Sequence, residues 1–252
     1  MLVGTACLKM SCHVLAHSPL HKNGSSLMLE IWGRPYSSNV IPVIWTANEL
    51  GLDYTLQLAG GSFGKLDTED YAQINPNRMI PAIRDGDFAL WESLSIVRYL
   101  CDRYGTGDLS PADPQTRAIA DQWMEWSASK AFMPVIYLFF ATVRTQPADR
   151  DPAKIADLRD EAHEALTILD AHLADRPYVC GDCFTMGDIP LGCVAYRYFN
   201  VEVDRPGLPN VETWYRHLTE RTAYRDHVMR HFGSNPDDWA ALEKACASEG
   251  VI

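Results

Sequence analysis

The sequence predicts two domains of different class, an α/β domain followed by an all-helical domain. Short β-prone runs alternate with helical patterning up to about residue 105. The next stretch, 105–114, holds two glycines and two prolines, a composition typical of linkers. No strand pattern comes after it. A chain of 252 residues is long enough for two modest domains, each with its own core.

The first half opens with a short strand at 29–32 and the turn residues of 33–39. Apolar side chains then recur at helical spacing from 40 to 50, and Gly51 ends that helix. A second strand at 54–58 completes a βαβ unit with parallel strands. The remaining elements are a hairpin around Asp85-Gly86-Asp87 and a helix over 92–104.

The second half is predicted to be helical throughout. Period and boundary residues indicate helices over 115–142, 151–174, 186–198 and 209–220. We therefore expect a first domain at 28–105, a linker at 106–114 and a helical domain at 115–233.

Both ends of the chain extend beyond these domains. Residues 1–27 are expected to be an upstream extension with few contacts to the core. Residues 234–252 are expected to be a C-terminal extension, in which Trp239, Leu242 and Ala245 mark a short helix lying on the helical domain.

Charge and cysteine usage limit the classes of function. The formal net charge is −11 and the pI is near 5.1, so no overall positive field attracts nucleic acid or an anionic membrane. No run of 18 apolar residues is present, and we expect no membrane segment. Seven scattered cysteines, an odd number, do not suggest a secreted disulfide framework. With no apolar core of signal-peptide length near the start, a cytoplasmic location is the simpler expectation.

Several motifs in a fixed order resemble glutathione S-transferases. Ile80-Pro81 precedes the hairpin, Glu92-Ser93 opens the next helix, and a helical domain comes last. Trp32-Gly33-Arg34 followed by Ser37-Ser38-Asn39 is similar to the bacterial theta-like group of this family. The resemblance runs from Met28 to about Met229. It implies a thioredoxin-like domain of order β-α-β-α-β-β-α that binds glutathione, a helical bundle that shapes the co-substrate pocket, and a homodimer.

By this resemblance, Ser37 is the candidate catalytic hydroxyl, with Ser38 and Asn39 as alternatives. Asn39 stands where many theta-like members have Pro, so the assignment within the loop stays open. A free thiol with a pKa of about 8.5 is only a few per cent ionised at pH 7. Lowering that pKa by about two units takes about 2.7 kcal/mol, which a hydroxyl donor and a helix terminus can supply. The structural alternative is a serine that only caps a helix.

Glutathione contacts are expected at the two motifs that flank the hairpin. The resemblance implies a cis bond at Ile80-Pro81, with the backbone of Ile80 pairing with the cysteinyl part of glutathione. The alternative is a proline that starts an edge strand. Ser93, at a helix N-terminus, suits a carboxylate, and Glu92 can meet the γ-glutamyl ammonium.

Further candidates are assigned by their position near these motifs. Arg78, beside Met79, and Lys65 are candidates for the glycyl carboxylate of glutathione. Candidates for the substrate pocket are three side chains near the expected sulfur or on the helical domain: Arg34, Tyr36 and Tyr137.

Thr185 and Asp188 match a capping-box pattern, with Asp in place of Glu or Gln, and this role is structural. Cys180 and Cys183 have redox spacing but lie between helices. No second pair completes a zinc site, so no metal is expected.

Three functions remain open at this stage. The leading one is a detoxifying transferase that conjugates glutathione to a small apolar electrophile or dehalogenates it. The second is glutathione-dependent reduction of a peroxide or disulfide. The third is a non-catalytic scaffold that binds glutathione without turnover.

Overall fold

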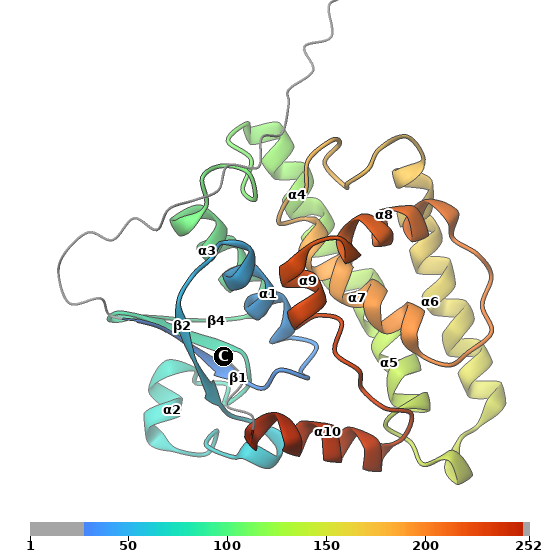
Figure 1. Ribbon diagram of the computed structural model, residues 1–252, viewed down its shortest axis with the longest axis horizontal. Helices are drawn as coiled ribbons and strands as arrows, with labels where there is room; N and C mark the ends of the chain where they lie inside the picture. The colour runs from blue at the N-terminus through green and yellow to red at the C-terminus, as the bar shows by residue number, and fades with distance from the viewer. Residues whose placement is uncertain (1–27, 249–252) are drawn as a thin grey trace, which may run out of the picture.

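The computed structural model describes residues 28–248, and the expectation for residues 1–27 lies outside this range. Within this range a four-stranded mixed sheet comes first, and a helical domain follows it (Figure 1). The strand order is β2-β1-β3-β4. The strands are β1 (Leu29–Gly33), β2 (Tyr54–Leu58), β3 (Ala82–Asp85) and β4 (Phe88–Trp91).

The pairing of the strands follows from their connections. β1 and β2 are parallel because a helix crosses over between them, with Leu29 opposite Tyr54. β3 is antiparallel to both β1 and β4, and the turn at Gly86 closes the predicted hairpin with a φ of 64°. The predicted order β-α-β-α-β-β-α is confirmed.

Three helices cover the sheet: α1 (Ile41–Glu49), α2 (Glu69–Ile74) and α3 (Ser93–Tyr104). Helices α1 and α3 share one apolar core with β1 and β3, which includes Ile31, Ile44 and Ile96. Tyr71 and Ile74 of α2 belong to a separate small cluster with Ala82.

The helical domain is built around α7 (Asp188–Asn200), whose residues are buried from Asp188 to Tyr198. Phe139, Leu166 and Trp214 contribute to this core from the surrounding helices. The single helix predicted over 115–142 is interrupted by a π turn at Ser127–Ala131. The other helices are α4 (Pro114–Trp126), α5 (Phe132–Thr142), α6 (Pro152–His172), α8 (Pro209–Thr219) and α9 (Thr222–His227).

The C-terminal helix α10 (Pro236–Ser248) contacts both domains rather than the helical domain alone. The Trp239 ring lies 5.4 Å from that of Phe139 in α5 and 5.5 Å from that of Tyr36 in the first domain. Glu243 forms an ion pair with Arg34. Among residues 28–248, no helix is long and apolar enough to cross a membrane.

Candidate active site

The loop after β1 is a tight turn that leads into α1. The Ser37 N–H donates to the Arg34 carbonyl oxygen at 3.0 Å. The Ser37 carbonyl oxygen in turn accepts from the N–H groups of Val40 and Ile41, at 2.9 and 3.0 Å. Ser37 therefore lies one turn before the regular helix, which begins at Ile41.

Gly33 allows this turn to close. A Cβ atom built on Gly33 would lie 2.6 Å from Cγ2 of Val40, whose side chain is fully buried. Such a separation is well inside van der Waals contact. The strand end and the turn can thus approach this closely only with glycine at position 33.

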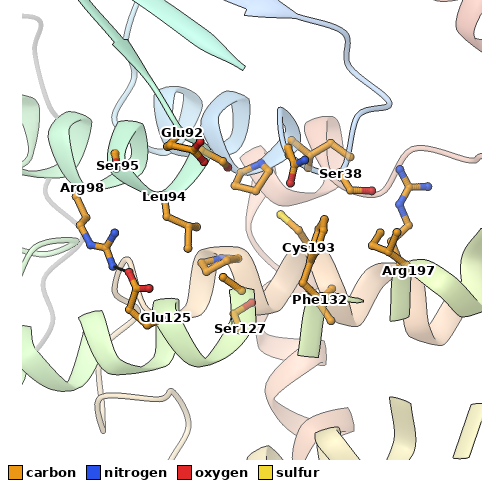
Figure 2. Close-up of a pocket in the computed structure, with 18 residues that line it drawn as sticks. Ser38, Glu92, Leu94, Ser95, Arg98, Glu125, Ser127, Phe132, Cys193 and Arg197 are labelled. Atoms are coloured by element: carbon orange, nitrogen blue, oxygen red, sulfur yellow. Dashed lines mark hydrogen bonds and ion pairs between the residues drawn. The ribbon is translucent and has the colours of Figure 1, made fainter. Parts of the chain in front are cut away.

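A cavity of about 310 Å³ lies where the two domains meet (Figure 2). Its first-domain wall comes from the loop after β1 and the N-terminus of α3, and its other wall comes from α5 and α7. Figure 2 places Ser38 and Arg197 toward one end and the Arg98–Glu125 ion pair toward the other. The residues that line it are Ser38, Asn39, Ile41, Pro42, Glu92, Ser93, Leu94, Ser95, Arg98, Glu125, Ser127, Ala128, Phe132, Ile136, Pro190, Cys193, Val194 and Arg197.

Four of the predicted site residues meet at this cavity: Ser38, Asn39, Glu92 and Ser93. Ser93 is the first residue of α3, and its buried Oγ has no hydrogen-bond partner within the described chain. Glu92 precedes the helix with a φ of 72° and an exposed side chain. Ser37 is half-buried beside Ser38 but does not line the cavity.

The peptide bond of Ile80-Pro81 is cis, as predicted. The carbonyl oxygen of Met79 accepts from Tyr71 Oη at 2.6 Å and from Asn75 Nδ2 at 2.8 Å. These bonds fix the backbone that enters β3. Met79 itself is 62% exposed, and this segment lies outside the cavity wall.

Arg78 and Lys65 both have left-handed backbones, with φ of 54° and 69°. Arg78 Nη2 donates to Glu69 Oε1 at 2.9 Å, and its Nη1 donates to two carbonyl oxygens of the segment before α2. Lys65 is exposed, with Nζ 5.7 Å from the centre of the Trp32 ring. Neither side chain lines the cavity.

The three residues predicted for the substrate pocket lie elsewhere. Arg34 pairs with Glu243, and Tyr36 is buried against Trp239. Tyr137 is 48% exposed on the outer surface of α5. The apolar wall is made instead by Phe132, Ile136, Pro190 and Val194.

The motif analysis did not identify Arg197, the charged residue at this wall that is almost fully buried, with 2% exposure. Its Nη2 donates to the Tyr36 carbonyl oxygen at 2.8 Å, directly before Ser37 in the chain. Burial lowers the pKa of Arg197 to about 10, so the guanidinium is charged at neutral pH. The available signal was an arginine within the mostly apolar run that follows Asp188 in this helix.

Cys193 also lines the cavity, and a thiol there raises the question of a cysteine nucleophile. Burial raises the pKa of the Cys193 thiol well above its usual range. A neutral buried thiol is a poor nucleophile, so Cys193 acts as an apolar wall residue.

Thr185 and Asp188 form a network that differs from the predicted capping box. The Asp188 carboxylate accepts from the Thr185 N–H at 2.9 Å, which is one half of that motif. The Thr185 hydroxyl donates to the same carboxylate instead of capping the helix. Asp188 Oδ1 also accepts from the Val179 N–H and from Trp214 Nε1, which ties α7 to α8. Burial raises the pKa of Asp188 to about 6 despite these donors.

No group of three or more His, Cys, Asp or Glu side chains within 28–248 is arranged to hold a metal ion.

Two family models match the chain, one for each domain. The model for the glutathione S-transferase N-terminal domain matches residues 32–111, and that for the C-terminal domain matches residues 152–217. Glutathione S-transferase GstB of Escherichia coli K12 is 40% identical over 204 residues, which are 80% of this chain and 98% of the relative. Glutathione S-transferase 3 of Zea mays is 29% identical over 79% of this chain and 93% of its own length.

Solved structures of similar proteins have the same architecture. The theta class glutathione S-transferase of Xanthomonas axonopodis pv. citri, with glutathione bound, has a TM-score of 0.77 and 43% identity. That match covers 81% of this chain and 99% of the Xanthomonas chain. The Bombyx mori glutathione transferase BmGSTD1 has a TM-score of 0.72 and 25% identity, covering 92% of this chain and 99% of the other.

Proposed function

The chain belongs to the glutathione S-transferase family, and we propose that it activates the glutathione thiol at Ser37 for attack on a small apolar electrophile. The observation that carries this proposal is the cavity between the domains. It brings Ser38 and Asn39, the neighbours of Ser37, and the N-terminus of α3 to an apolar wall of the helical domain. The attack is a conjugation or, where a halide leaves, a dehalogenation.

Glutathione is proposed to lie along the first-domain side of this cavity. The buried Ser93 hydroxyl and the N-terminus of α3 suit the γ-glutamyl carboxylate, because helix N-termini favour anions. Glu92 is proposed to meet the ammonium group, and the Ile80 backbone, which lies beyond the cavity wall, is proposed to pair with the cysteinyl unit. Arg78 and Lys65 stay candidates for the glycyl carboxylate, although Arg78 already holds the segment before α2.

The thiolate is proposed to accept a hydrogen bond from Ser37, with Ser38 and Asn39 as the alternatives. The Ser37 hydroxyl makes no hydrogen bond to any residue of 28–248, so it can turn toward a sulfur atom. Ser38 and Asn39 lie directly on the cavity wall. A donor at the entry to α1 also benefits from the positive end of that helix.

Substitution of each of the three by alanine identifies the donor. For Ser37→Ala we expect the pKa of the bound thiol to rise by about two units, and turnover at pH 7 to fall about 25-fold with the ionised fraction of the thiol. Glutathione binding at pH 7 should weaken only about fourfold, because the lost bond stabilises the ionised thiol and the protonated thiol binds as before. Thiolate absorbance in the ultraviolet, followed against pH, measures the shift. The same result for Ser38→Ala or Asn39→Ala would move the role to that residue.

Two other functions fit the same fold. Reduction of a hydroperoxide or disulfide through bound glutathione predicts a higher rate on a hydroperoxide than on an aromatic halide. A scaffold predicts glutathione binding without turnover of either compound. Assaying both compounds with the parent protein separates the three possibilities.

We also propose a cytoplasmic homodimer with a role in detoxification, in which α4 packs against the partner's first domain. Exposed apolar side chains of Ile119 in α4 and Phe88 in β4 support such a contact, since each is more than 40% exposed. Light scattering after gel filtration tests the dimer.

A further inference from the structure

Arg197 is a buried cation without a counter-charge in the described part of the chain. It forms no salt bridge there, and the groups that act on its charge are Tyr36, Cys193, Tyr196 and Arg144. None of these is a carboxylate. Burying an ion without an opposite charge is unfavourable, so an uncompensated guanidinium calls for an explanation.

Three aromatic rings surround the guanidinium. Its Cζ lies 4.4 Å from the ring centre of Phe139, 4.8 Å from that of Phe232 and 5.3 Å from that of Trp239. These contacts hold the group in place and compensate part of its charge through the ring faces. They do not satisfy its N–H donors.

Most of the hydrogen-bonding capacity of Arg197 is unused. The bond from Nη2 to the Tyr36 carbonyl oxygen explains one donor. Nε and Nη1 are buried and lack a partner within 28–248. A role limited to holding the Tyr36 loop leaves these two nitrogens unexplained.

The surroundings add positive charge to this end of the cavity. Arg144 stacks on the Trp239 ring, 4.7 Å from its centre; burial lowers the pKa of Arg144, and the nearby charge of Arg34 lowers it further. Glu243, the carboxylate of this cluster, is paired with Arg34. In a chain of net charge −11, this is a local excess of positive charge beside the cavity that is proposed to hold glutathione.

We propose that Arg197 binds a carboxylate on the electrophile, so that the co-substrates are small apolar electrophiles that carry an anionic group. This inference depends on the proposed function, because Arg197 shares the cavity with Ser38 and Ser93. A guanidinium suits a carboxylate because its planar N–H groups match the two oxygens. The apolar wall of Phe132, Ile136 and Val194 contacts the rest of the substrate.

A pair of aromatic halides that differ in charge tests the assignment: 4-chloro-3-nitrobenzoate and 4-chloro-3-nitrobenzamide. In both, the thiolate electron pair forms the C–S bond, and the C–Cl bond breaks as chloride leaves with its electron pair. The carboxylate is unchanged by the reaction, and the nitro group is common to both. Each kcat/KM is divided by the uncatalysed rate constant with glutathione, which removes the difference in intrinsic reactivity.

For the parent protein, we expect the normalised kcat/KM to favour the benzoate by about 10-fold or more. Arg197→Met should abolish this preference. Loss of the bond to the Tyr36 carbonyl oxygen lowers both values in common, so the ratio of the benzoate value to the benzamide value is the quantity compared. Arg197→Lys should restore part of the preference. Arg205→Met is the matched control, because Arg205 also stacks on an aromatic ring, that of Tyr198, and donates to backbone carbonyl oxygens, but lies outside the cavity.

Equal loss on both substrates in Arg197→Met would overturn the assignment and leave Arg197 a structural role. A second measurement needs neither a folded variant nor turnover: the affinity of the parent protein for the two glutathione conjugates, by calorimetry. The proposal requires the carboxylate conjugate to bind at least about 10-fold more tightly than the carboxamide. Equal affinity overturns it. Tighter binding of the carboxylate conjugate without turnover of either halide would support the carboxylate subsite at Arg197. The same result would contradict the proposed transferase reaction.

Discussion

Arg197 Nη2 donates a hydrogen bond of 2.8 Å to the carbonyl oxygen of Tyr36, 161 positions earlier in the chain. This bond joins the central helix of the second domain to the residue that precedes Ser37. The loop that is proposed to activate glutathione is thus positioned by the domain that is proposed to select its co-substrate. A change in the packing of α7 should therefore affect both the nucleophile and the pocket.

Ser93→Ala is expected to weaken glutathione binding without weakening the fold. The Ser93 Oγ is buried and has no partner within residues 28–248, so its loss removes no bond between these residues. A hydrogen bond to a carboxylate is worth about 1.5 to 3 kcal/mol, so the KM for glutathione should rise about 10- to 100-fold. Steady-state kinetics and thermal melting measure the two effects. Ser129→Ala, at an exposed serine outside the cavity, serves as the control. A large fall in stability with an unchanged KM would show that Ser93 has only a structural role.

Glu243→Gln is expected to weaken the packing of α10 against the rest of the chain and so to lower the free energy of unfolding. Its carboxylate is 10% exposed and offsets the charge of Arg34 in a cluster that also holds Arg144 and Arg197. Removing one partner of a largely buried pair costs about 3 kcal/mol. Denaturant unfolding measures this loss. The control is Glu69→Gln, because the Glu69 carboxylate is 88% exposed in its pair with Arg78 and should cost less than about 1 kcal/mol. Equal losses of unfolding free energy in the two variants would contradict the prediction that burial makes the Arg34–Glu243 pair the more stabilising one.

Asp188→Asn is expected to destabilise the protein by about 2 to 4 kcal/mol at pH 7, because an amide nitrogen would face donors that now meet a carboxylate. This loss of unfolding free energy should be larger at acidic pH. Since burial raises the folded-state pKa to about 6, the native protein takes up a proton between pH 6 and pH 4 before the unfolded chain does. Proton uptake by the native state stabilises it, and the asparagine variant lacks this gain.

The difference in unfolding free energy between the parent protein and Asp188→Asn should therefore widen from pH 7 to pH 5. Urea unfolding at several pH values measures it. A difference that narrows in acid would mean that the four hydrogen bonds outweigh burial and hold the pKa of Asp188 low.

Gly33→Ala is expected to destabilise the first domain by about 1 to 3 kcal/mol, the usual range for overpacking. The added methyl would meet both Cγ atoms of Val40, at 2.6 and 2.8 Å. Val40→Ala alone should also cost stability, because it leaves a cavity in the core. The double variant should be more stable than the sum of the two losses predicts, since the new methyl fills the space. Strict additivity would show that the strain at position 33 has another origin.

The sequence by itself determined the class and order of the elements. Local signals were sufficient for most of them: short β-prone runs for the strands, helical spacing around α1 and α3, and Gly86 for the hairpin turn; the helix at α2 was expected only from the family resemblance. Such signals depend on only a few neighbouring residues, so they can be interpreted without knowing the fold. The family resemblance also depended on short motifs, among them Ile80-Pro81 and Glu92-Ser93, whose spacing in the chain is visible directly.

Only the tertiary structure decided which side chains meet at the cavity. The π turn at Ser127–Ala131 adds a residue to one helical turn and rotates the faces of α5 by about 100°. This rotation sets which α5 side chains face the cavity, and Phe132 lines it while Tyr137 is exposed. The closure of α10 onto Tyr36 and the burial of Arg197 beside the same loop depend on contacts between positions more than 150 residues apart. Long-range packing and desolvation set these contacts, and neither leaves a periodic trace in the sequence.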